Sequence, residues 1–78
     1  MNALGTADGR AKAAAREAWA AVRETHDLAR EAAVRAAQNY RMKPTDAAWE
    51  AWHAATVTWE RARVAEGRAR IVMEAALA

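Results

Sequence analysis

Glu50 and His53 come closest, by residue type and spacing, to the ligands of a metal site. A glutamate followed three residues later by a histidine is the pattern that binds iron or manganese in carboxylate-bridged helical bundles. Such a centre also needs an inward-facing carboxylate from a neighbouring helix. If the chain folds back near Pro44, the segment at the same level is 34–37, which contains a valine, an arginine and two alanines. We therefore expect no metal site and no bound cofactor.

The residue types used for nucleophilic catalysis and phosphate binding are scarce. The 78 residues include no cysteine and no serine, and the three glycines, at positions 5, 9 and 67, are isolated from one another by other residues. A phosphate-binding loop needs clustered glycines, and most covalent hydrolases need a serine or cysteine nucleophile. The sequence therefore predicts neither an enzyme nor a small-molecule substrate. Because the chain has no cysteine to form a disulfide, we also expect a cytoplasmic location.

A column of basic residues follows one side of the first half of the chain: Lys12, Arg16, Arg23, Arg30 and Arg41. On a helix, such a column can follow the phosphates of a nucleic acid. Acidic residues at positions 17, 24 and 31 run directly beside it, and the net charge is only +2. Opposite charges in such proximity cancel the field that attracts a polyanion. The pattern favours an ordinary solvated face, and nucleic-acid binding remains the alternative.

The elements that carry these residues are predicted to be two helices. Alanine, the residue with the highest helix propensity, occupies 25 of the 78 positions, and there is only one proline. Pro44 disfavours helix at the residue before it, and Thr45 can cap the helix that follows. Asp8 is a candidate N-cap for the first helix.

We therefore predict a single all-α domain over residues 1–78, an antiparallel two-helix hairpin. Its expected elements are a helix over about 9–41, a turn over 42–45 and a helix over about 46–77. No apolar run is long enough to span a membrane.

A seven-residue repeat predicts how the two helices pack. The positions at which they are expected to contact each other form a heptad seam of alanine and tryptophan. In the first helix the seam columns are expected to be Ala15, Val22, Ala29 and Ala36, together with Ala18, Thr25, Ala32 and Asn39. In the second helix they are expected to be Ala48, Ala55, Ala62, Ala69 and Ala76, together with Trp52, Trp59, Glu66 and Met73. Large tryptophans would then meet small alanines across a close helix pair.

His26 and Glu66 are the polar residues nearest to this seam. His26 belongs to a stripe with Trp19, Ala33 and Tyr40, which we expect to form a border that shields the seam. Glu66 lies within a turn of His26 if the hairpin folds at residues 43 and 44. Both an ion pair with a basic neighbour and a solvated position are compatible with that placement.

A second apolar column, Val57, Val64 and Ile71, lies on the far side of the second helix from the tryptophans. One partner helix cannot cover both sides, so the column is predicted to be an interface, either with a second copy or with a foreign protein. We expect a homodimer that forms a four-helix bundle, because a lone hairpin buries little area. Trp49, near the turn, is a candidate anchor for a partner pocket.

These features favour binding over catalysis as the function. The sequence predicts a small protein–protein interaction module, such as an adaptor, an inhibitor, an assembly chaperone or a phage-type modulator of host machinery. The alternative is a nucleic-acid-binding hairpin dimer that uses the arginine column.

Overall fold

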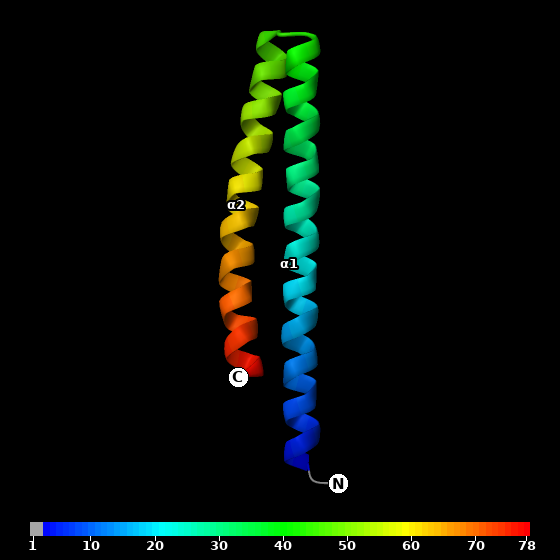
Figure 1. Ribbon diagram of the computed structural model, residues 1–78, viewed down its shortest axis with the longest axis vertical. Coiled ribbons are helices and arrows are strands. Elements are labelled where there is room, and N and C mark those ends of the chain that lie inside the picture. Colours follow the sequence, from blue (N-terminus) through cyan, green and yellow to red (C-terminus); the bar gives the residue numbers. More distant parts are fainter. Residues whose placement is uncertain (1–2) are drawn as a thin grey trace.

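The chain is an antiparallel pair of long helices, α1 (Ala3–Met42) and α2 (Asp46–Leu77), joined by a short turn (Figure 1). The computed structural model describes the backbone of residues 3–78 and the side chains of residues 8–78. The described part is a rod of 63 × 16 × 13 Å. Because α1 is the longer helix, its N-terminal part extends beyond the end of α2 (Figure 1). The all-helical hairpin predicted from the sequence is confirmed.

The turn is built from local hydrogen bonds. The Lys43 amide donates to the Asn39 carbonyl at 2.9 Å and ends α1. Thr45 has an extended backbone, and its side-chain oxygen accepts a hydrogen bond from the Ala48 amide at 3.1 Å. This contact satisfies one of the amides that a helix N-terminus leaves without a partner. Thr45 is thus the N-cap of α2, the role indicated by the sequence.

The start of α1 differs from the sequence prediction. The helix begins at Ala3, so Asp8 lies inside it and is not its N-cap. The Asp8 carboxylate instead contacts the Lys12 ammonium at 3.2 Å, one helical turn further along. Such an i, i+4 pair supports the helix interior by about 0.2–0.5 kcal/mol.

The interface between the helices is thin. Among the described side chains only Ala29 and Ala33 are buried, with 8% and 4% of their surface exposed. The half-buried residues of α2 include the expected alanines 55, 62 and 69 together with Trp59, Glu66 and Met73. Trp52 and Ala76, also expected in the seam, are exposed. The interface therefore consists mainly of small side chains flanked by a few large ones.

One predicted column of α1 was wrong. Its members are all exposed: Ala18, Thr25, Ala32 and Asn39. The stripe expected to be a border instead faces α2, with Ala33 buried and Trp19, His26 and Tyr40 half-buried. The two columns are one residue apart, and alanine occurs in both, so the seven-residue repeat alone does not choose between them. The larger rings decide, because turning Trp19 and Tyr40 inward removes more apolar surface from water.

An aromatic contact closes the interface near the turn. The rings of Tyr40 on α1 and Trp52 on α2 stack with their centroids 5.5 Å apart and their planes at 30°. Offset stacking of this kind contributes about 0.5–1.5 kcal/mol beyond simple burial. The contact joins the helices where the chain reverses.

Substitution of Ala33 tests the packing of the inward stripe. Ala33→Leu should lower the free energy of unfolding by about 1–3 kcal/mol, because the close helix contact leaves no room for the larger side chain. The control is Ala18→Leu, which places the same side chain on the exposed column and should change stability by less than about 0.5 kcal/mol. Urea unfolding followed by circular dichroism measures both. Equal stability of the two variants would contradict the assignment of the inward stripe.

Candidate interaction surface

The outward column of α2 is exposed apolar surface. Val64 and Ile71 have 52% and 68% of their surface exposed, and Val57 is half-buried. The half-buried alanines of α2 lie on the opposite side of the helix, which faces α1. The column borders a shallow groove of about 440 Å³ lined by Val57, Glu60, Arg61, Val64, Ala65 and Arg68. The hairpin itself leaves this face without a cover.

Charges of opposite sign flank the column. On a helix, residue i+3 lies about 60° to one side of residue i, and residue i+4 lies about 40° to the other side. One edge of the column therefore carries Glu60, Gly67 and Glu74, and the other carries Arg61, Arg68 and Ala75. All six residues are exposed. The face is an apolar strip with an acidic edge and a basic edge.

Aromatic rings form a second exposed group near the turn. Trp49 stacks on His53 with ring centroids 5.2 Å apart and nearly parallel planes. A groove of about 190 Å³ lies beside them, lined by Trp49, Trp52, His53 and Thr56. Trp49 is exposed, as a partner anchor must be. Within residues 8–78, no group of three or more histidine or acidic side chains comes close enough together to hold a metal ion.

The basic column of α1 is partly occupied by contacts within the chain. Lys12 pairs with Asp8, and the Arg23 guanidinium lies 5.2 Å from the centre of the Trp19 ring. Arg16, Arg30 and Arg41 are exposed. The column is therefore present on the surface, but two of its five members already have a partner.

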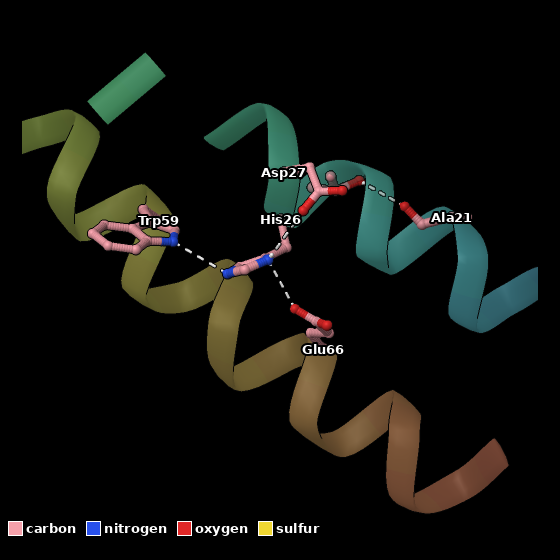
Figure 2. A network of polar contacts seen from close by, with 6 residues as sticks. Ala21, His26, Asp27, Trp59 and Glu66 are labelled. Carbon is pink, nitrogen blue, oxygen red and sulfur yellow. Dashed lines mark hydrogen bonds and ion pairs between the residues drawn. The ribbon is translucent and has the colours of Figure 1, made fainter. Parts of the chain in front are cut away.

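His26 is the centre of a polar contact between the helices (Figure 2). Its Nδ1 lies 2.8 Å from a carboxylate oxygen of Glu66, and its Nε2 accepts a hydrogen bond from the Trp59 indole at 3.1 Å. The His26 and Glu66 side chains are only 18% and 25% exposed. Because Nε2 accepts a proton donor, the contact fits a neutral imidazole with its hydrogen on Nδ1.

Only part of this contact, the proximity of His26 and Glu66, was predicted from the sequence. The fold-back at residues 43 and 44 placed Glu66 within a turn of His26, and the structure shows a contact between these two side chains rather than a fully solvated Glu66. The Trp59 hydrogen bond was missed. The same fold-back places Trp59 at the level of residue 28, within a turn of His26. Because a buried indole N–H usually has a hydrogen-bond acceptor, this proximity was the signal from which the contact could have been predicted.

Over the residues described, neither α1 nor α2 contains a stretch long and apolar enough to cross a bilayer. The charges along both helices account for this, since acidic and basic side chains recur within every few turns.

Replacing His26 tests the contact between the helices. His26→Ala should destabilise the fold by about 1–3 kcal/mol, because the Trp59 indole and the Glu66 carboxylate would lose their partner while still partly buried. The control is His53→Ala at an exposed position, which should cost less than about 1 kcal/mol. Thermal unfolding of both variants gives the comparison. If the two substitutions cost the same, the contact contributes nothing specific to stability.

No protein-family model matches the chain, and no curated protein or solved structure is significantly similar to it.

Proposed function

We propose that this chain is a non-enzymatic protein–protein interaction module, of the adaptor, inhibitor or assembly-chaperone kind, that acts through the outward face of α2. The observation that carries the proposal is the exposure of Val64 and Ile71 in one column along a helix. Contiguous apolar surface of this kind marks interaction sites in proteins. A cytoplasmic location fits a chain without cysteine.

The exposed area of the chain supports self-association. The chain exposes 6218 Å², whereas a globular monomer of 8.5 kDa exposes about 4,700 Å². The excess is more than the roughly 800 Å² that each partner buries in a standard interface. A hairpin with two buried alanines also buries too little apolar surface to offset the loss of conformational entropy on folding. A homodimer supplies the missing contact area.

The position of the column determines the shape of this dimer. It lies on the side of α2 away from α1, so a two-fold pair places the two α2 helices at the centre and the two α1 helices outside. This proposed arrangement has four helices lying nearly in a row and so differs from the four-helix bundle expected from the sequence. Trp49 stays exposed in this arrangement and is available to a foreign protein.

A charge placed in the column should break the dimer. We expect wild-type protein to have twice the chain mass of 8.5 kDa and Val64→Glu to be monomeric, because two unpaired carboxylates would face each other in an apolar interface. The control is Val34→Glu, at an equally exposed valine of α1 (48%), which should remain dimeric. Light scattering after size exclusion at micromolar concentration measures all three. A wild-type mass near that of one chain would exclude the homodimer.

Salt dependence separates this proposal from nucleic-acid binding through Lys12, Arg16, Arg23, Arg30 and Arg41. Phosphate contacts make affinity fall steeply between about 50 and 200 mM salt, whereas apolar helix packing responds little. We expect the dimer to persist over this range and a labelled DNA or RNA duplex to bind only weakly at low salt. Tight duplex binding that Arg16→Glu and Arg30→Glu abolish would instead support the nucleic-acid alternative.

A further inference from the structure

We propose that two copies of the chain pair in parallel through α2, so that Val57, Val64 and Ile71 each face the same residue of the partner subunit. The inference rests on the proposed function, because it assigns an orientation to that homodimer. It follows from the arrangement of charges along the two edges of the apolar column.

Symmetry determines which edges meet. When the two-fold axis runs parallel to the helices, the acidic edge of one α2 lies against the basic edge of the other. When the axis runs perpendicular to the helices and between them, each edge meets the same edge of the copy. The acidic edge carries Glu60 and Glu74, and the basic edge carries Arg61 and Arg68. The two orientations therefore differ in electrostatic energy although they bury the same column.

In the parallel dimer, unlike charges are neighbours. Glu60 of one copy then lies beside the partner's Arg61, and the two residues differ in level by one residue, about 1.5 Å along the helix axis. The contact occurs twice because of the two-fold symmetry. In an antiparallel dimer, the columns of the two copies face each other when the two-fold axis passes beside Val64. This arrangement places Arg61 beside the partner's Arg68, and the contact again occurs twice. Two favourable contacts in one orientation and two repulsive contacts in the other favour the parallel dimer.

One further feature beside the column agrees with parallel pairing. Gly67 lies on the acidic edge, and a Cβ built there would meet nothing within 4 Å. The hairpin itself thus gives no reason for a glycine. In the parallel dimer, Gly67 faces the partner's Arg68 and leaves space for the aliphatic part of that side chain.

Parallel pairing also determines where other groups lie. Both turns are at the same end of the dimer, so the exposed Trp49 of each copy is presented in the same direction. An antiparallel dimer would present the two turns at opposite ends of the rod. The orientation therefore decides whether a partner meets two aromatic anchors together or one at each end.

Single-cysteine variants distinguish the orientations directly. The chain has no cysteine, so Val57→Cys and Ile71→Cys each introduce one thiol. In a parallel dimer each variant cross-links with itself, because equal positions face each other. In a mixture of the two variants, one carrying a size tag, the expected products join like positions only. Positions 57 and 71 are about 21 Å apart along the axis of α2, too far to cross-link in a parallel dimer.

Charge reversal gives a second readout whose sign differs between the orientations. Arg61→Glu should weaken a parallel dimer about tenfold, because the new carboxylate faces the partner's Glu60. Adding Glu60→Arg to the same chain should restore the affinity, since the pair is then reversed and not removed. In an antiparallel dimer, Arg61→Glu would strengthen association by pairing with the partner's Arg68. Arg30→Glu on α1 is the control for the change in net charge, and sedimentation equilibrium measures all affinities.

Each outcome decides the question. Self-linking of both cysteine variants with weaker association of Arg61→Glu supports the parallel dimer. A mixed product of Val57→Cys and Ile71→Cys, or tighter association of Arg61→Glu, overturns the orientation and leaves the homodimer intact. A monomer at every concentration overturns the orientation and the homodimer together. Circular dichroism of each variant shows whether helix content is unchanged, so that loss of folding is not mistaken for loss of pairing.

Discussion

The constraint on which this structure depends is the small area that two alanine-rich helices bury against each other. Alanine lets helix axes approach closely, but each alanine removes little apolar surface from water. Ala29 and Ala33 are the only buried side chains among those described, and the rest of the interface is half-open to solvent. Helix formation is strongly favoured locally, whereas the packing of one helix on the other is weakly favoured. The remaining features can be understood as consequences of this imbalance.

A uniform alanine interface specifies register poorly, because one alanine fits against another at many axial positions. Directional contacts supply what shape does not. The Trp59, His26 and Glu66 contact requires the two helices to be at one level, since an indole donor and a carboxylate must reach opposite sides of the same ring (Figure 2). The stacked rings of Tyr40 and Trp52 add a second such requirement near the turn. Polar and aromatic side chains thus contribute specificity where aliphatic burial contributes little stability.

The same shortage of buried area connects the fold to the proposed function. A chain that exposes Val64 and Ile71 along one side of α2 reaches a lower free energy when that side is covered. The charged edges beside the column then influence which partner binds this side and in which orientation, because charges contribute more to orientation than to affinity. In the proposed homodimer, folding and association are parts of one process.

Local sequence features were enough to predict the two helices and the turn. Alanine propensity, the effect of Pro44 on the residue before it and the capping hydroxyl of Thr45 act within a few residues of each position. The outward placement of Val64 and Ile71 was also predictable, because helical periodicity separates them from the tryptophan side. These properties do not depend on what the distant half of the chain does.

Only the tertiary structure decided which side of α1 faces α2. The column with Ala18 and the stripe with Ala33 are one residue apart and both contain alanine. The seven-residue repeat therefore does not distinguish which of them faces α2. Their difference arises only when Trp19, His26 and Tyr40 meet particular residues of the other helix. The Trp59 hydrogen bond to His26 has the same origin, since it joins positions 33 residues apart. A contact of that kind depends on the rotation and level of both helices together, which no local pattern determines.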